Sequence, residues 1–366
     1  MRPIIDAHLD LAWNALYFNR DLLASVADLR LAEQGMTDEL ARARNTLTLP
    51  ELRRAKVAIC LATLMGRSGP ERPPRTGFKR TDLDYANQTI AYSHAKGQLA
   101  YYRLLEQQRH LRFITTREQL KAHWEAWTKS PSATPLGIIL SMEGADSIMD
   151  PSQVLAWWND GLRVVGPVHY GRSQYAYGTA TDGPLSDAGV KLLQEFMRLG
   201  VILDVTHLSD QSFAHALEVY SGPVLASHHN CRALVPADRQ LTDEQIKRLV
   251  EREAVIGTAF DSWMLYPGWK RGETNRELVG IEAGADHIDH ICQLAGSARH
   301  CALGTDLDGG FGTEQTPHDL DTYTDVHKLE EVLARRGYRN ADIDAIFHGN
   351  WLRLFSAALP EQAAGS

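Results

Sequence analysis

The sequence predicts a single α/β domain built as a (β/α)8 TIM-type barrel, with the functional site at the carboxyl ends of the strands. Eight short apolar runs rich in β-branched residues recur along the chain, and segments with helical periodicity separate them. Most of these runs also end in histidine or an acidic residue. A strand followed by a helix, repeated eight times, is typical of a closed parallel barrel rather than of an open sheet.

The eight predicted strands follow in chain order. They are "RPIIDAH" (2–8), "KVAICLATL" (56–64), "PLGIILSME" (135–143), "LRVVGPVH" (162–169), "GVILDVTH" (200–207), "GPVLASHH" (222–229), "AVIGTAF" (254–260) and "HCALGTD" (300–306). Between them, "SDAGVKLLQEFMRLG" (186–200) and "TDEQIKRLVEREA" (242–254) have helical periodicity, and Thr242 is the expected N-cap of the second. Residues 66–80, rich in Gly, Pro and Arg, predict a surface loop, either a flap over the site or an ordinary connection.

Composition restricts the class of protein and its partners. The 366 residues are 44% hydrophobic and 23% charged, as expected of one soluble globular domain over 1–366, with a flexible tail from about residue 358. The net charge of −8 and the pI near 6.0 argue against a nucleic-acid partner. The sequence has no apolar run long enough for a membrane span. We expect no secretory leader, and we expect the four widely spaced cysteines to be reduced. We therefore expect a cytoplasmic protein with no membrane partner; a homodimer is compatible with the sequence.

Polar residues fall where the predicted strands end. Five runs end in metal-competent residues, and a sixth ends in His169. These residues are His8 and Asp10 at the first run, Glu143 at the third, His207 at the fifth, His228 and His229 at the sixth, and Asp306 at the eighth. Burial penalises such groups unless something pairs with them, so their placement at the same end of successive strands indicates a metal site.

The number of donors favours two ions. Three imidazoles and two carboxylates are too many for one tetrahedral ion with an open position, but they suit two ions about 3.5–4 Å apart with a bridging carboxylate. Glu143, from the third strand, is the expected bridge between a group with His8 and Asp10 and a group with His207. The last ligand is His228 or His229, because adjacent strand residues point to opposite sides.

The eighth strand supplies the expected acid/base group. Asp306 could take a proton from the attacking water and pass it to the leaving amine. Asp308, two residues further on, is a weaker candidate, and we expect it to cap the turn at Gly309 and Gly310.

The chain resembles the membrane (renal) dipeptidase family of metallopeptidases, from residue 4 to about residue 355. The matching motifs are "DAHLD", "SMEGAD", "GPLSDAGVKLLQEFMRLGVILDVTHLSD", "ASHHNCRAL", "RQLTDEQI", "ADHIDHICQLAG", "ALGTDLDGG" and "HGNWLRLF". The resemblance implies a binuclear zinc barrel that hydrolyses the amide bond of dipeptides, often with a D-residue at the carboxyl-terminal position.

The resemblance also implies roles for individual residues. The implied metal ligands are His8, Asp10, Glu143, His207 and His228, which favours His228 over His229. His169 corresponds to the residue that polarises the scissile carbonyl or stabilises the oxyanion, and Arg239 to the partner of the substrate carboxylate. Asp306 corresponds to the acid/base; with His169 and Glu143 it makes up the expected catalytic set, and with His169 and Arg239 the expected substrate contacts. Other divalent metals also suit this ligand set.

Some segments depart from the family pattern. "HLD", "EGA" and "SHHN" differ from the usual motifs but keep the ligands, whereas 170–182 carries Tyr170, Arg172, Tyr175 and Tyr177 where asparagines are usual. Arg172 is expected either to attract an acidic substrate side chain or to pair with Asp182. His287 and His290 are expected to be structural. Alternative functions are hydrolysis of a lactone, cyclic amide or β-lactam, or a tailoring homologue without dipeptidase activity.

Overall fold

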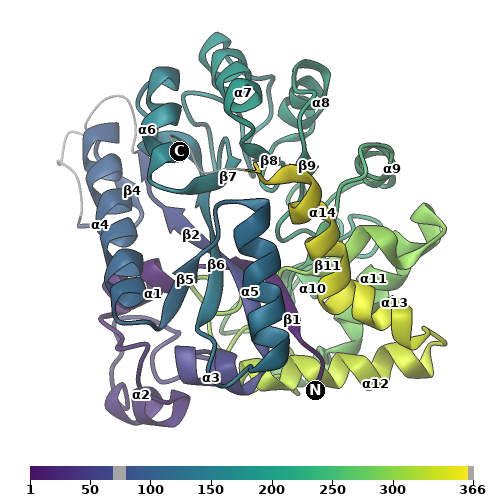
Figure 1. Ribbon diagram of the computed structural model, residues 1–366. Helices are drawn as coiled ribbons and strands as arrows, with labels where there is room; N and C mark the ends of the chain where they lie inside the picture. Colours follow the sequence, from purple (N-terminus) through teal and green to yellow (C-terminus); the bar gives the residue numbers. More distant parts are fainter. Residues whose placement is uncertain (69–79, 362–366) are drawn as a thin grey trace.

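A computed structural model describes residues 1–68 and 80–361. Eight parallel strands form a barrel wall in the order β10-β11-β1-β2-β6-β7-β8-β9. The wall closes between β9 and β10, where Ala226 pairs with Ile256 and the Gly257 N–H donates to the Ala226 carbonyl at 2.8 Å. The predicted fold class is confirmed, and the helices surround the strands (Figure 1).

Each barrel strand overlaps one predicted run. The strands are β1 (Ile4–Leu9), β2 (Val57–Met65), β6 (Leu136–Glu143), β7 (Leu162–Gly166), β8 (Ile202–Asp204), β9 (Val224–Leu225), β10 (Ile256–Thr258) and β11 (Cys301–Leu303). The last five are shorter than predicted, because the chain leaves the hydrogen-bonded ladder before the end of the predicted run. β8, for example, ends three residues before His207.

Three short strands were not predicted. β5 (Leu111–Phe113) pairs with the amino-terminal half of β6, and β3 (Arg67–Ser68) pairs with β4 (Asp84–Tyr85). The start of the predicted 66–80 loop therefore belongs to a two-stranded sheet. The rest of that loop, 69–79, lies outside the described residues, as do residues 362–366 of the predicted tail.

The helices occupy the connections between strands. They are α1 (Leu11–Phe18), α2 (Val26–Ala32), α3 (Leu49–Arg54), α4 (Gln88–Gln107), α5 (Arg117–Lys129), α6 (Val154–Asn159), α7 (Asp187–Leu199), α8 (Asp210–Val219), α9 (Asp243–Glu251), α10 (Ser262–Leu265), α11 (Glu282–Ala295), α12 (Lys328–Arg335), α13 (Asn340–Asp344) and α14 (Asn350–Ala358). The two helices predicted by sequence correspond to α7 and α9. Thr242 caps α9 through a capping box with Gln245, which satisfies backbone N–H groups at the helix start.

Two apolar layers hold the barrel together. Inside the wall, buried residues such as Ile5, Ile59, Ile139 and Ile202 form one cluster with Trp351 of α14. Between the wall and the outer helices lies a larger cluster. Figure 1 shows α14 and α5 crossing the strands. Since α14 packs on the interior cluster, the amino end of the barrel is filled by apolar side chains, and polar groups concentrate at the other end.

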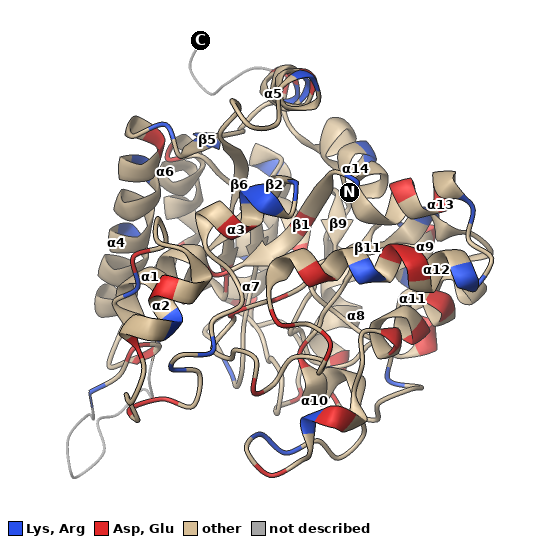
Figure 2. Ribbon diagram, turned by 90° about the horizontal axis from the view of Figure 1, so that it is seen from below, with Lys and Arg blue, Asp and Glu red and all other residues tan. Residues whose placement is uncertain are grey.

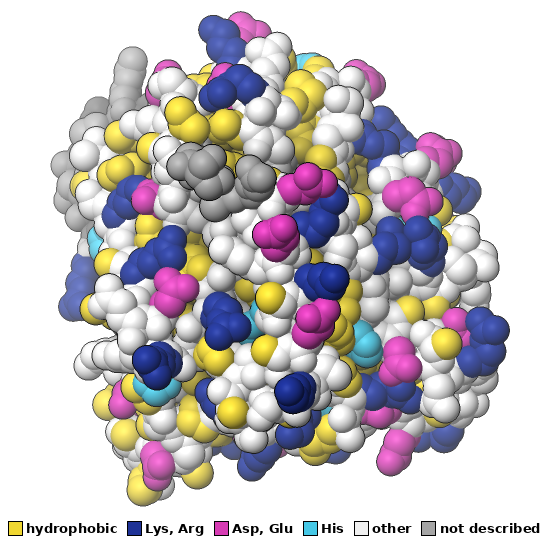
Figure 3. Space-filling view, viewed as in Figure 1, with side chains coloured by type: hydrophobic (Ala, Val, Ile, Leu, Met, Phe, Trp, Pro, Cys, Tyr) yellow, Lys and Arg dark blue, Asp and Glu magenta, His cyan; other side chains and the backbone are white. Residues whose placement is uncertain are grey.

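The surface carries charges of both signs. Figure 2 shows acidic and basic residues interspersed along α11 and α12, where Arg336 pairs with Asp286 at 2.7 Å. The face in Figure 3 likewise mixes the two signs. In residues 1–68 and 80–361, no helix is both long and apolar enough to cross a bilayer. All four cysteines are free thiols, as predicted.

Candidate metal centre

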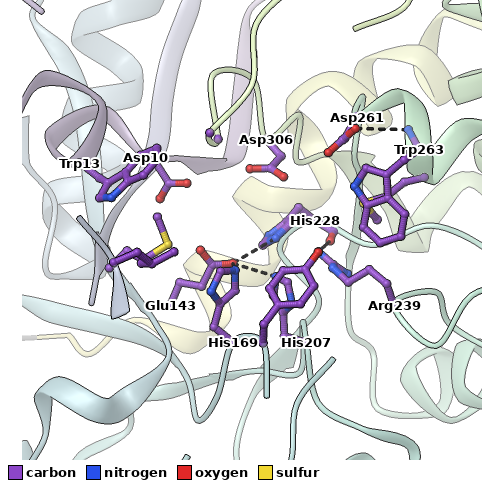
Figure 4. Close-up of a pocket in the computed structure, with 16 residues that line it drawn as sticks. Asp10, Trp13, Glu143, His169, His207, His228, Arg239, Asp261, Trp263 and Asp306 are labelled. Atoms are coloured by element: carbon purple, nitrogen blue, oxygen red, sulfur yellow. Dashed lines mark hydrogen bonds and ion pairs between the residues drawn. The ribbon is translucent and has the colours of Figure 1, made fainter. Parts of the chain in front are cut away.

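The predicted donors converge at the carboxyl end of the barrel. Three overlapping groups, each with ligand atoms within 4.8 Å of one another, are formed by His8, Asp10 and Glu143; by Glu143, His207 and His228; and by His8, His228 and Asp306. They come from β1, β6, β8, β9 and β11 or the residues directly after them. Figure 4 shows the cluster with Glu143 beside the imidazoles. The convergence predicted from strand order is therefore present in the structure.

Two donors, His8 and Asp10, lie at the end of β1, where its pairing with β2 is irregular. The register between β1 and β2 shifts between Asp6 and Leu9, and Asp6 is turned away from the cluster. Its carboxylate accepts hydrogen bonds from the His8 N–H at 3.0 Å and the Thr305 hydroxyl at 2.6 Å. Asp10 stands at the N-cap of α1, yet its side chain makes no cap bond. His8 Nε2 and Asp10 Oδ2 are 3.4 Å apart.

Glu143 faces both sides of the cluster. Its Oε1 lies 3.0 Å from His207 Nε2 and 3.2 Å from His228 Nε2, and its Oε2 lies 3.6 Å from His8 Nε2. Burial opposes ionisation of this carboxyl, but the surrounding imidazoles outweigh burial and lower its pKa well below the usual range. One carboxylate thus faces two separate donor groups, as a bridging ligand must.

The imidazoles of the second group are held by bonds at their other nitrogen. His207 Nδ1 is 2.9 Å from the Thr179 hydroxyl, and His228 Nδ1 is 2.9 Å from the Ser227 hydroxyl. These contacts leave Nε2 of both rings for the cluster. Burial lowers the pKa of both rings well below 6.5, so both are neutral. Oriented, neutral imidazoles are the form that binds a metal ion.

The structure places His228, but not His229, among the candidate donor groups of its described residues. His228 belongs to two of the donor groups, whereas His229 belongs to none of those found among the described residues. The His229 backbone N–H donates to the Gly257 carbonyl at 2.7 Å, which holds this residue against β10.

Backbone conformation shows that the site is strained. His207 has φ 69° and Asp306 has φ 58°, in the left-handed region that side chains with a Cβ rarely adopt. Such residues cost on the order of 1–3 kcal/mol each and persist where the surrounding structure fixes them. At both positions the backbone turns a polar side chain toward the cluster.

The donor set fits divalent metal ions. His8 Nε2 and Asp10 Oδ1 are buried and have no hydrogen-bond partner within the described chain, and an unpaired buried polar atom is costly. Both belong to the same donor group. A bound cation would satisfy these two atoms together with the facing oxygens of Glu143.

His169 lies at the edge of the cluster, with Nε2 3.8 Å from Glu143 Oε1. Burial lowers its pKa to about 4, with Arg67 and Arg239 acting in the same direction, so the ring is neutral at pH 7. Its Nδ1 is 3.4 Å from Nη1 of Arg67. Because arginine only donates, Nδ1 is the acceptor and the ring proton is on Nε2.

The two acids after β11 have different surroundings. Asp306 lines the cavity, has a side chain 16% exposed, and places Oδ1 3.8 Å from His8 Nε2. Burial, together with Asp10 and Glu143, raises its pKa well above the usual value. The prediction that the Asp308 side chain caps the turn at Gly309 and Gly310 is wrong. The Asp308 carboxylate instead accepts the Thr46 N–H and hydroxyl, both at 2.7 Å, because the 46–47 segment packs directly beneath it.

Arg239 is a buried cation on the cavity wall, only 2% exposed. Its Nη2 donates to the His228 carbonyl at 2.8 Å, which ties the guanidinium to the metal centre. Its Nη1 is buried and unpaired in the part of the chain that the structure describes. This nitrogen is available to an anionic ligand.

The cavity above the cluster has a volume of about 140 Å³. Apart from the predicted residues, its walls are formed by Trp13, Met65, Leu83, Tyr170, Asp261, Trp263, Met264, Gly309 and Gly310. Asp261 was missed by sequence analysis, although it directly follows the predicted strand 254–260, where the same strand-end rule applies.

Other expectations for 170–182 are revised. Arg172 is exposed and stacks over Tyr177 at 5.0 Å. Asp182 accepts a hydrogen bond from the Gln211 amide at 2.8 Å, so the predicted pair between Arg172 and Asp182 is wrong. Arg172 is also not one of the residues that line the cavity. Tyr175 is a core residue.

The histidine pair of α11 is structural, as predicted. His287 Nδ1 accepts the Cys231 N–H at 3.0 Å, and His290 pairs with Asp243 at 2.7 Å.

A closed parallel barrel that carries this donor cluster at the carboxyl ends of its strands defines a metal-dependent hydrolase with an amidohydrolase-like fold. The comparisons specify the group within that class. The chain belongs to the membrane dipeptidase family (peptidase family M19), whose family model matches residues 1–364.

Individual relatives agree with this assignment. The dipeptidase tcpJ of Claviceps purpurea is 28% identical over 59% of the chain and 49% of its own length, so the match spans about half of that relative. The dipeptidase AC, a metallopeptidase, has a similar fold with a TM-score of 0.76 and 22% identity over 98% of this chain and 99% of that one. A metallopeptidase from Rhodobacter sphaeroides, liganded with a phosphinate mimic of L-Ala-D-Ala, gives a TM-score of 0.75 and 21% identity over 98% and 99%.

Proposed function

We propose that this chain is a binuclear zinc dipeptidase that hydrolyses the amide bond of dipeptides, including those with a D-residue at the carboxyl-terminal position. The observation that carries the proposal is the convergence of two donor groups on the opposite oxygens of Glu143. They lie beside a cavity lined by Arg239, whose Nη1 has no partner among the described residues. The dipeptide mimic bound to the Rhodobacter relative supports an L,D-dipeptide as substrate.

His8, Asp10 and Glu143 would hold one ion, and Glu143, His207 and His228 the other. When bound, such ions make water a stronger nucleophile at neutral pH and polarise the scissile carbonyl. Glu143 holds its two donor groups at a fixed spacing, since it is buried and bonded to the imidazoles.

Arg239 would bind the terminal carboxylate of the substrate. Nη1 has no hydrogen-bond partner to give up among the described residues, and the bond from Nη2 to the His228 carbonyl fixes the guanidinium. An arginine oriented in this way binds a carboxylate without losing much side-chain entropy. The scissile bond would then lie over the cluster, about one residue away from the carboxylate.

His169 would stabilise the oxyanion. The Arg67 contact and the low pKa keep the ring neutral with its proton on Nε2, the nitrogen that faces Glu143. A preoriented N–H donor that meets developing negative charge in a site that excludes water lowers the barrier.

Asp306 would move the proton. It borders the cavity and is partly exposed to it, so its carboxylate can accept a proton from the attacking water. The same group would then donate that proton to the leaving amine, which completes the hydrolysis.

A hydrolysis screen tests the proposal. Protein loaded with zinc should cleave members of a matrix of L,L- and L,D-dipeptides, and metal analysis should find two ions per chain. Glu143→Gln, which keeps the size of the side chain, should lose both activity and metal. Cleavage of lactones, cyclic amides or β-lactams without any dipeptide turnover would overturn the proposal, as would one ion or fewer per chain in active protein.

A further inference from the structure

Asp261 is a buried acid in the cavity wall that the metal centre does not use. It follows β10, begins α10 and is 5% exposed. It belongs to none of the donor groups found in residues 1–68 and 80–361. Figure 4 shows Asp261 with Trp263 on the Arg239 side of the cavity, across from Asp10 and Trp13.

In the part of the chain that the structure describes, the Asp261 carboxylate has only neutral hydrogen-bond donors. It accepts the Trp263 N–H at 3.3 Å and the Gln315 amide at 3.1 Å. Among the described residues, no Lys, Arg or His nitrogen forms an ion pair with it. Arg271 acts on Asp261 electrostatically, but its guanidinium is bonded to Glu314, with Nε 3.1 Å from the carboxylate.

A structural role does not explain the negative charge. Asp261 is the N-cap of a four-residue helix, and Ser, Thr or Asn would cap it equally well. Burial without a cationic partner raises the pKa of Asp261 to about 7, which makes the charge costly in the free protein. A cation that entered the cavity would stabilise the ionised carboxylate and remove this cost.

We propose that Asp261 binds a cationic side chain on the carboxyl-terminal residue of the substrate, so that the enzyme prefers dipeptides ending in lysine, ornithine or arginine. The inference rests on the proposed function. With the terminal carboxylate on Arg239 and the scissile bond over Glu143, the carboxyl-terminal residue occupies the side of the cavity where Asp261 and Trp263 lie. The indole of Trp263 offers an apolar surface to the methylene stem of such a side chain.

Two matched substrates isolate the charge. Ala-Lys and Ala-norleucine have side chains of nearly equal length, and only lysine is charged; each is used with an L- and a D-residue at the carboxyl terminus. The full-length, metal-loaded protein should show a higher kcat/KM for Ala-Lys. Asp261→Asn keeps the shape and both hydrogen bonds, because the Gln315 amide can turn to accept. The Asp261→Asn variant should lower the ratio of kcat/KM for Ala-Lys to kcat/KM for Ala-norleucine at least about tenfold.

Three controls make the experiment decisive. Glu118→Gln removes one negative charge from an exposed position on α5 and should leave the ratio as in the wild type. The ratio of Lys-Ala to norleucyl-Ala should not respond to Asp261→Asn. Thermal unfolding checks that the variant is folded, and Asp261→Ser, which also preserves the cap, replaces it if it is not.

Other outcomes would overturn the inference. An equal Ala-Lys to Ala-norleucine ratio in wild type and variant would show that the carboxylate does not bind the cation. Equal losses on all dipeptides would assign Asp261 to the substrate amino group or to the support of α10. Absence of any dipeptide turnover by the wild type would overturn the proposed function and this inference with it, whereas turnover with an unaltered ratio would overturn the inference alone.

Discussion

Replacing Arg239 with alanine should weaken dipeptide binding while leaving the metal centre in place. The guanidinium is buried, and within residues 1–68 and 80–361 only one of its terminal nitrogens has a partner, the His228 carbonyl. Truncating one member of a desolvated, hydrogen-bonded charge pair costs about 2–5 kcal/mol, or about 30- to 5,000-fold in binding. Because the substrate carboxylate is held equally before and during reaction, we expect most of the loss in KM.

The assay compares each dipeptide with its carboxyl-terminal amide, which lacks the carboxylate. In the wild type the acid should be the much better substrate, and in Arg239→Ala the two should become nearly equal. Arg239→Lys keeps the charge but cannot both bond the His228 carbonyl and present a planar fork, so it should be intermediate. Metal content should match the wild type. If acid and amide lose the same factor, or if KM for the dipeptide does not change, Arg239 does not bind the carboxylate.

Three further perturbations follow from contacts around the site. In Gly309→Ala, the added Cβ would lie 2.1 Å from Asp306 Oδ1, so the carboxylate must move, and kcat should fall about 100-fold with full metal content. Thr179→Val removes the 2.9 Å contact to His207 Nδ1 and should weaken metal binding about 10- to 100-fold in a chelator competition. The pKa of Asp261 is about 7 in the folded protein, compared with an ordinary value of 3.8. Protonation of this carboxyl therefore stabilises the fold at low pH, and this stabilisation is lost as the pH rises from about 4 through 7. Urea unfolding should therefore show that the free energy of unfolding of Asp261→Asn, relative to that of the wild type, increases by about 2–4 kcal/mol between pH 4 and pH 8.5.

Each of these predictions has its own control. Gly97→Ala, in α4 with no atom within 4 Å of the added Cβ, should leave kcat unaltered. Full kcat in Gly309→Ala would mean that the position of Asp306 does not matter. Wild-type metal affinity in Thr179→Val would remove any orienting role for its hydroxyl. A pH-independent difference between Asp261→Asn and the wild type would show that the carboxyl titrates normally.

The barrel and most of the metal centre could be predicted from the sequence because both follow local rules. Apolar runs of β-branched residues separated by helical segments specify strands and helices, and parallel strands bring their carboxyl ends to one side. A histidine or acid at the end of such a run, as at His8, Glu143 and His207, is therefore placed at the same end of the barrel. Six of the eight runs were assigned a polar residue at their end, and Asp261 was missed because it lies one residue beyond the run 254–260, which itself ends in the apolar Phe260.

Other features depend on contacts between distant segments. Asp308 lies on the same strand end as Asp306, but its carboxylate bonds Thr46, more than 250 residues earlier. Arg172 stacks over Tyr177, and Asp182 bonds Gln211, so neither partner could be inferred from neighbouring charge. The contact between Arg67 and His169, which sets the tautomer of that ring, joins residues 102 positions apart.

By itself the sequence determined the strand order, the end of the barrel that carries the site and the donor candidates His8, Asp10, Glu143 and His207, since these follow from hydrophobic periodicity and the parallel arrangement. Only the tertiary structure decided that His228 rather than His229 faces Glu143. Only it decided that, among the described residues, one nitrogen of Arg239 has no partner and Asp261 is buried without a counter-ion. The physical reason is that burial, pKa and hydrogen-bond saturation are properties of the space around a side chain. That space is formed by segments brought together only when the barrel closes.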